Sequence, residues 1–212
     1  MYVYKQGSGT WEVEGKINID DGRLFVDEGT LICNGSDNIV SHDIEVQDGG
    51  RLTGECGFTI LDQQEDFYFK SGATLVPGKN GVGTITIGWN STRNATAEAQ
   101  LLTGSTYEWE VGAGNATDKL HVKKNAKAVL LKLQDFTLKI LDAGSTPSTS
   151  DQLPVFTYET GVTRSIGTVT FDTSELGGSW DTSSLSLVDD TEGTIYLTGL
   201  SASGSGTLIL LK

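Results

Sequence analysis

Short runs of alternating apolar and polar residues, each closed by a glycine turn, recur in the first part of the chain. Three of them, KINIDDG, RLFVDEG and TLICNG, follow one another at a spacing of seven residues and place Ile17, Leu24 and Leu31 at equivalent positions. Alternation with a period of two indicates β-strands with one face toward a core and one toward water. Because each run is only about four residues long, the pattern does not suit the hairpins of a β-sandwich. It predicts short strands joined by tight corners.

The same pattern returns further along the chain. The stretch DDGRLFVDEGTLI at 20–32 aligns with DGGRLTGECGFTI at 48–60 at an offset of 28 residues. A third, looser copy is KSGATLVPG at 70–78, in which Leu75 takes the place of Leu52. Self-similarity at a period of 20–50 residues, with strand signals and almost no helix signals, indicates a solenoid.

An offset of 28 residues would make three strands and their corners into one coil, with coils stacked about 4.8 Å apart. We then expect Leu24 and Leu52 to touch in one inward column and residues 34–43 to bulge from a corner. The sequence thus predicts an all-β fold, a right-handed parallel β-helix (β-solenoid), with longer, irregular capping strands in the C-terminal half. The coils would occupy residues 1–140, and 141–212 would continue or cap the same domain.

The glycine-rich segment SGATLVPGKNGVGTITI, residues 71–87, raises the question of a phosphate-binding loop. Such a loop needs Gly-Lys-Ser/Thr at the start of a helix, but Gly78 and Lys79 are followed by Asn80, and TITIG alternates as a strand does. Pro77 and Gly78 suit a type II turn, because proline fixes φ and glycine accepts a positive φ. The segment is predicted to be a corner of the fold.

Longer strands are expected beyond residue 100. TYEWEV and FTLKIL both alternate apolar and polar residues. Residues 129–140 also fit the spacing of an amphipathic helix, but the strict alternation at their end favours strands.

The charge of the chain excludes some partners. The 212 residues carry a net charge of −13, whereas nucleic acid requires a basic footprint on the protein. We therefore expect no nucleic-acid partner, and without an apolar run of about 18 residues no membrane insertion. The opening MYVYKQGSGTW lacks the apolar stretch of a signal peptide. If the protein is exported, we expect this chain to be a mature or excised piece.

Candidate catalytic and metal-binding residues are few. Among the corner carboxylates Asp20, Asp21, Asp27, Glu28 and Asp48, only Asp20 and Asp48 would stack on each other at an offset of 28, and turn chemistry explains both, so we expect no metal site. Neither His42 nor His121 has a nucleophile nearby in sequence, and no outward acid pairs with a basic residue at a stacked position. We expect no catalytic residues and no cofactor.

Aromatic residues and asparagines provide candidate surface sites. An exposed aromatic row would bind glycans, and the candidates for such contact are Trp11, Tyr107, Trp109 and Trp180. Tyr107 and Trp109 share a face with Val111, which is the pattern of a core. Candidate N-glycosylation sequons begin at Asn34, Asn90, Asn94 and Asn115. The two cysteines, Cys33 and Cys56, are expected on adjacent faces rather than stacked, which leaves a disulfide open but not favoured.

One family resemblance rests on these motifs. GTLICNGS, GGRLTGECGFTI and above all SGATLVPGKNGVGTITIG resemble the autotransporter-associated β-strand repeat of bacterial surface proteins. The downstream STYEWEVGAGNATDKLHVKKNAKAVLLKLQ resembles the segment that follows this repeat. The resemblance covers roughly residues 20–140 and implies a parallel β-helix on an exported, cell-surface protein.

The function expected from the sequence is that of a non-enzymatic structural module in an extracellular or cell-surface protein, such as an adhesin, matrix or filament subunit. The alternatives are a β-helical polysaccharide-degrading enzyme and a glycan-binding module. The expected partners are copies of the chain itself, with surface glycans as the alternative. The N-terminal MYVYK has no cap motif, and the C-terminal GTLILLK at 206–212 is apolar and β-prone, so both ends are candidates for pairing with another chain.

Overall fold

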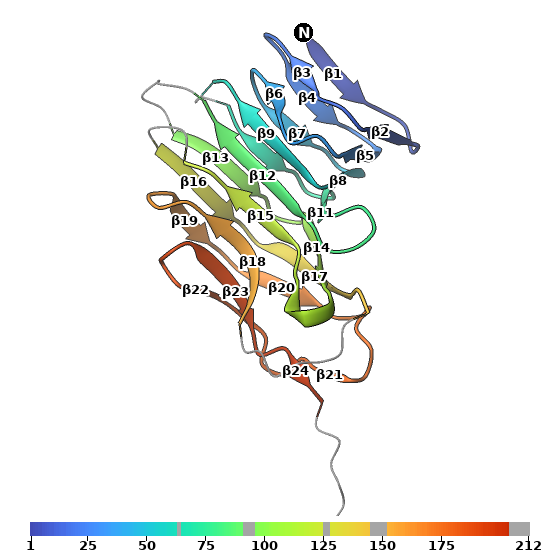
Figure 1. Cartoon of the computed structure of the whole chain (residues 1–212), viewed down its shortest axis with the longest axis vertical. Helices are drawn as coiled ribbons and strands as arrows, with labels where there is room; N and C mark the ends of the chain where they lie inside the picture. The colour runs from blue at the N-terminus through green and yellow to red at the C-terminus, as the bar shows by residue number, and fades with distance from the viewer. Residues whose placement is uncertain (63–64, 91–95, 125–127, 145–151, 204–212) are drawn as a thin grey trace, which may run out of the picture.

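The chain forms a parallel β-helix, as the sequence predicts (Figure 1). The computed structural model describes residues 1–62, 65–90, 96–124, 128–144 and 152–203. Along the chain, strands visit three sheets in turn, and each full circuit, called a coil here, adds one strand to each sheet. Successive strands within a sheet pair in parallel along the long axis, except near the C-terminal end.

The strands are given in spatial order for each sheet. Sheet 1 contains β1 (Tyr2–Lys5), β4 (Arg23–Val26), β7 (Ile44–Val46), β10 (Phe67–Phe69), β13 (Thr96–Leu101), β16 (Ala128–Leu133) and β19 (Thr163–Ile166). Sheet 2 contains β2 (Thr10–Val13), β5 (Gly29–Cys33), β8 (Gly50–Gly54), β11 (Thr74–Pro77), β14 (Thr106–Val111), β17 (Phe136–Asp142) and β20 (Val169–Asp172). Sheet 3 contains β22 (Ser186–Asp189), β23 (Thr194–Thr198), β18 (Leu153–Tyr158), β15 (Lys119–Val122), β12 (Thr84–Trp89), β9 (Cys56–Ile60), β6 (Asn38–Val40) and β3 (Asn18–Ile19). A small pair, β21 (Trp180–Asp181) with β24 (Ser201–Ala202), and a 3-10 turn, η1 (Ala113–Asn115), complete the described elements.

The coil is shorter than the sequence offset suggested. Leu52 of β8 pairs with Leu31 of β5, 21 positions earlier, whereas Leu24 of β4 lies on sheet 1 and pairs with Ile44. The expected contact in one column between Leu24 and Leu52 is therefore wrong. An offset of 28 spans one coil of 21 residues and one further side of seven. Because all three sides of a coil share the same short motif, sequence similarity alone does not distinguish a coil of 21 residues from one of 28.

Two details follow from the shorter coil. Residues 34–43 are not an insertion, because they contain β6, the third side of their coil. The third repeat copy is placed correctly, since Leu75 pairs with Leu52. The glycine-rich segment is a corner, as predicted: β11 ends at Pro77, and Gly78 has a φ of 84°.

One inward column runs through the whole helix, and it is called the central column here. Its members all occupy the same register position of sheet 2: Trp11, Leu31, Leu52, Leu75, Tyr107, Leu138 and Phe171. The four from Leu52 to Leu138 have no exposed surface. Burying stacked apolar side chains in this way provides the main driving force for the fold.

The coils widen along the chain. Sheet 1 strands lengthen from three residues in β10 to six in β13, and the register step grows to 32 positions between Phe67 and Ala99. A wider coil encloses a wider core, which must be filled at the density of a close-packed solid. Large aromatic side chains fill it, including the fully buried Trp89, Tyr107 and Trp109. Strands β16 and β17 replace the alternative helix over 129–140.

The two ends of the helix differ. At the N-terminal end, β1, β2 and β3 each pair with only one neighbour in the described structure. At the C-terminal end, β23 and β22 add antiparallel strands beyond β18. Trp180 and Leu200 are buried there, and Leu176 and Leu187 pack against the core. Antiparallel strands thus cover sheet 3 at the C-terminal end, whereas β19 and β20 each pair with one neighbour there. At the N-terminal end of the described structure, the first strand of every sheet has one open edge.

The register can be tested with a double-mutant cycle. Because Leu31 and Leu52 contact each other in the central column, each Leu→Ala change should cost about 2–5 kcal/mol, with a coupling energy above about 0.5 kcal/mol. The distant pair Leu52 and Leu197 should be additive within about 0.5 kcal/mol. Urea unfolding monitored by circular dichroism gives the free energy of unfolding of each single and double variant, and hence both coupling energies. Additivity of Leu31 with Leu52 would contradict the register.

Candidate functional site

A cluster of charged side chains covers the outer face of sheet 1. The Arg23 guanidinium lies 3.2 Å from the Asp43 carboxylate and 3.2 Å from that of Glu65. His42 Nδ1 lies 3.4 Å from Glu65 Oε1. Arg23, Asp43 and Glu65, which come from successive coils, line a hollow of about 440 Å³ together with Asp66 and other neighbours. We call them the sheet 1 cluster.

The cluster contradicts one sequence-based expectation. No outward acid was expected to face a basic residue at a stacked position, yet Arg23 of β4 stands beside Asp43, which directly precedes β7. The error has the same origin as the wrong coil length, because at an offset of 28 these two residues do not align. Asp43 and Asp66 lie 23 positions apart, and each directly precedes a buried apolar strand. This repeated pattern was the sequence signal that these two acids occupy equivalent positions in successive coils.

The environment of the cluster shifts two carboxyl groups. Burial raises the pKa of Glu65 to about 7, and the adjacent Asp43 raises it further than Arg23 and His42 lower it. Burial also raises the pKa of Asp66 to about 6, although the Glu98 backbone N–H donates to its carboxylate and opposes the shift. Near neutral pH, Glu65 therefore holds a proton for part of the time beside Asp43. Chemically, such a pair is able to give and accept a proton.

The carboxylates of Asp43 and Asp66 also accept hydrogen bonds from the backbone, which stabilise the fold. Asp43 Oδ1 accepts the backbone N–H of Asp66 at 2.7 Å, and Asp66 Oδ1 accepts that of Glu98 at 3.0 Å. Asp66 Oδ2 also accepts from Gln100 Nε2 at 3.0 Å. Each carboxylate thus accepts a backbone N–H of the next coil, from Asp66 directly before β10 and from Glu98 within β13, which would otherwise lack a partner there. The acids form a ladder of corner supports parallel to the helix axis.

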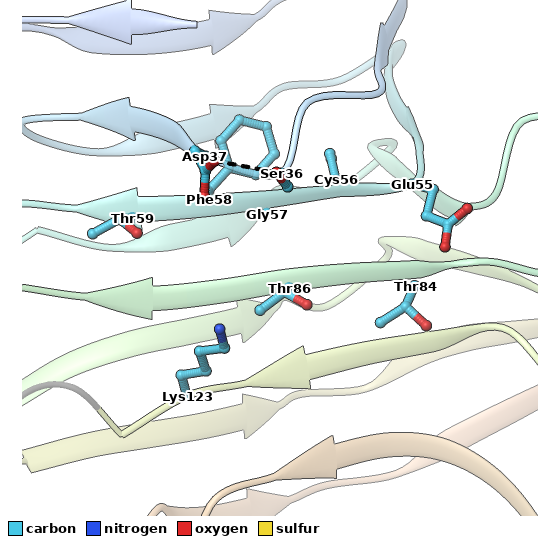
Figure 2. Close-up of a pocket in the computed structure, with 10 residues that line it drawn as sticks. All are labelled: Ser36, Asp37, Glu55, Cys56, Gly57, Phe58, Thr59, Thr84, Thr86 and Lys123. Atoms are coloured by element: carbon cyan, nitrogen blue, oxygen red, sulfur yellow. Dashed lines mark hydrogen bonds between the residues drawn. The ribbon is translucent and has the colours of Figure 1, made fainter. Parts of the chain in front are cut away.

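A second hollow, of about 410 Å³, lies on the outer face of sheet 3 (Figure 2). Thr84 and Thr86 point into it from β12, and Lys123 reaches toward it from the end of β15. Gly57 forms part of its floor, where a Cβ atom would lie 2.5 Å from the carbonyl oxygen of Ser36. The only aromatic side chain in its lining, Phe58, is buried in the core. The hollow has a polar lining and lacks a flat ring against which a sugar could stack.

The aromatic candidates do not form a surface row. Tyr107 and Trp109 are fully buried, and Trp109 Nε1 donates to the Asp118 carbonyl at 2.9 Å. Trp180 is 8% exposed and lies in the C-terminal cap. Trp11 is 47% exposed, but it occupies the first position of the central column. The four side chains therefore lie in or at the end of the core.

Other aromatic residues are exposed near the N-terminal end. Tyr4 of β1 and Phe25 of β4 stack with ring centroids 4.7 Å apart and planes inclined by 9°. Tyr2 lies beside both rings and is 62% exposed. The alternation of MYVYK is the sequence signal that Tyr2 and Tyr4 share one face of their strand. Only the structure places Phe25 beside them.

Three of the four sequon asparagines lie among the described residues, between strands of the helix. Asn34 follows β5, and its amide nitrogen lies 3.4 Å from Glu12 and 3.3 Å from Glu14. Asn90 is exposed after β12, and Asn115 ends η1 with a φ of 62°. Asn94 lies outside the described residues.

Metal ligands are not gathered in the described part of the chain, where no group of three or more His, Cys, Asp or Glu side chains could hold an ion. Asp20 lies between β3 and β4, whereas Asp48 lies between β7 and β8. The two carboxylates therefore belong to different corners, and the expected stacking of this pair is wrong. Within the described ranges, no helix is long and apolar enough to span a membrane.

Comparisons with known proteins add no family: neither a family model nor a curated protein matches the chain.

The shifted carboxyl groups predict a pH-dependent stability. Burial raises the pKa of Glu65 to about 7, of Asp66 to about 6 and of Asp118 to about 8. The folded chain thus binds more protons than the unfolded chain near these values, and stability falls as pH rises. We expect a lower thermal midpoint at about pH 8.5 than at about pH 6.5, and a smaller difference in Glu65→Gln.

The control is the Glu55→Gln variant, which changes an exposed carboxylate in a corner. It should keep the pH dependence of the unmodified chain. Burial lowers the pKa of His121. Its titration therefore affects stability at lower pH than the carboxyl groups do, and there it makes stability rise with pH. An unchanged pH dependence in Glu65→Gln would contradict the role given to Glu65.

Proposed function

We propose that this chain is a non-enzymatic structural module that forms a rigid β-helical rod in an extracellular or cell-surface protein. The single observation that carries the proposal is the central column, which continues from Trp11 to Phe171. A backbone ladder and a stacked core that run the length of the molecule resist bending and proteolysis, because each coil is held by its neighbours. The resemblance to the autotransporter-associated β-strand repeat supports the surface location.

The sheet 1 cluster favours a second candidate function, acid–base cleavage of a polysaccharide. Such enzymes place a carboxyl group of raised pKa near a second carboxylate, and Glu65, whose pKa burial raises, lies beside Asp43. The structural module remains the preferred proposal because Asp43 already accepts the Asp66 backbone N–H and pairs with Arg23. A general base occupied in this way is poorly placed to take a proton from a substrate.

Self-association is the second part of the proposal, and the N-terminal end is its site. Trp11 occupies the first position of the central column, no described coil lies beyond it, and it is 47% exposed. Open strand edges pair with other chains unless they are capped. We propose that the partner is a second copy, joined through the same end. The C-terminal end is less suited because β23 and β22 cover β18, so that only β19 and β20 present an open edge there. The terminal segment 206–212, considered above for strand exchange, lies outside the described residues.

A two-fold axis perpendicular to the rod makes this pairing geometrically consistent. Rotation about such an axis through sheet 1 reverses the strand direction, so that β1 meets its copy antiparallel and β2 meets the copy of β3. Closed two-fold contacts of this kind are the commonest in protein oligomers. They would bury both copies of Trp11 at the junction.

The chain should not cleave pectin, alginate or xylan. Incubation with each polymer, followed by assays for reducing ends and for unsaturated products, should show no release above that of the heat-denatured protein. Turnover that the Glu65→Gln change abolishes, in a variant that melts like the unmodified chain, would favour the enzymatic candidate instead.

The junction is tested by Trp11→Lys. A charge at the end of the apolar column should weaken dimerisation at least about tenfold, as measured by sedimentation equilibrium. Val188→Lys is the control, because Val188 is similarly exposed, at 44%, but belongs to β22. Circular dichroism shows whether each variant keeps its fold. A chain that stays monomeric at high concentration, or equal weakening by the two changes, would refute the proposed junction.

A further inference from the structure

The only two cysteines of the chain lie in consecutive coils at one corner of the helix. Cys33 ends β5 on sheet 2, and Cys56 begins β9 on sheet 3. The register of β5 with β8 continues to place Cys33 against Gly54, two residues before Cys56. A Cβ atom at Gly54 would lie 2.0 Å from the Cys33 carbonyl oxygen, so the two strands approach closely at this point.

The side chain of Asn38 locates the two cysteines independently of the strand register. Its Nδ2 atom lies 3.2 Å from Cys33 Sγ and 3.0 Å from the carbonyl oxygen of Gly57, the residue after Cys56. Asn38 is itself fully buried in β6. One amide nitrogen therefore bridges the sulfur of one cysteine and the backbone next to the other.

The two thiols are buried and differ in acidity. Cys33 has no exposed surface, and Cys56 is 5% exposed. A hydrogen bond from the Cys56 thiol, with others from Gly35 and Asn38, lowers the pKa of Cys33, whereas that contact and burial raise the pKa of Cys56. Cys33 is therefore the thiol that more readily becomes the nucleophilic thiolate.

We propose that Cys33 and Cys56 are a disulfide site, which an external disulfide of low molecular weight oxidises to a covalent link between the second and third coils. Local opening of the corner exposes Cys33, and its thiolate then attacks one sulfur of the external disulfide and releases one thiolate. Cys56 loses its proton and displaces the second thiolate from Cys33. One S–S bond forms in the protein and one breaks in the reagent. Two electrons pass to the reagent, and its two thiolates take up the two thiol protons.

The link would close a loop that contains β6, β7 and β8, which together make one full circuit of the helix. Constraining the unfolded chain in this way stabilises the folded state. The affected coils lie next to the open N-terminal end, where a β-helix has fewest neighbours to hold it. The effect does not depend on dimerisation, so it is separable from the proposed junction.

The experiment equilibrates the full chain with reduced and oxidised glutathione, once folded and once in denaturant, starting from both the reduced and the oxidised protein. After acid quenching and alkylation, mass spectrometry counts free thiols, mixed disulfides and the internal disulfide. We expect the equilibrium constant for the internal disulfide to be on the order of thirty-fold or more higher in the folded chain, as typical stabilising disulfides require. The oxidised chain should also unfold at a temperature several degrees higher.

The Cys33→Ser and Cys56→Ser variants are matched controls, since each can form only mixed disulfides with glutathione. Neither should show the rise in unfolding temperature. A folded-to-unfolded ratio below about tenfold would overturn the proposal, because the fold would then not favour the bond. Accumulation of mixed disulfides on the folded unmodified chain would overturn it as well.

Discussion

The fold depends on one constraint: each coil must place its inward side chains directly against those of the coil before it. Parallel strands in register supply the backbone hydrogen bonds, and the same register stacks the apolar residues into columns such as the one from Trp11 to Phe171. Because the side-chain period of a strand is two, a shift by one residue would turn a whole column to solvent. Corners must therefore have lengths that restore the register, and close approaches such as Gly54 against Cys33 mark where they do so.

This constraint explains what the sequence could predict. Alternation in RLFVDEG and TLICNG is local, so the strands, the parallel β-helix and the corner at Pro77 and Gly78 were all predictable. The coil length was not, because three similar sides per coil make a spacing of 21 hard to distinguish from one of 28. The pairing of Leu52 with Leu31 rather than Leu24 follows from backbone hydrogen bonds that leave no trace in residue type.

The sheet 1 cluster shows how such an error carries over to side chains. Arg23, Asp43 and Asp66 are separated in sequence and meet only when the coil has its true length. The sequence signal for their shared column was the spacing of 23 residues between Asp43 and Asp66, each directly before an apolar run, and the offset of 28 hid it. The inward position of Tyr107 and Trp109 was predictable, because it follows from local alternation along one strand. The exposure of Trp11 was not, because it depends on the arrangement of whole coils, with no described coil beyond β2.

The widening of the coils has a mechanical consequence. With side lengths that grow from three-residue strands in β10 to six-residue strands in β13, the molecule is a tapered beam rather than a uniform one. The bending stiffness of a beam rises steeply with its cross-section, so strain under a sideways load gathers in the narrow coils near the N-terminus. The broad, aromatic-filled coils then act as a stiff base, and the slender end as a compliant tip.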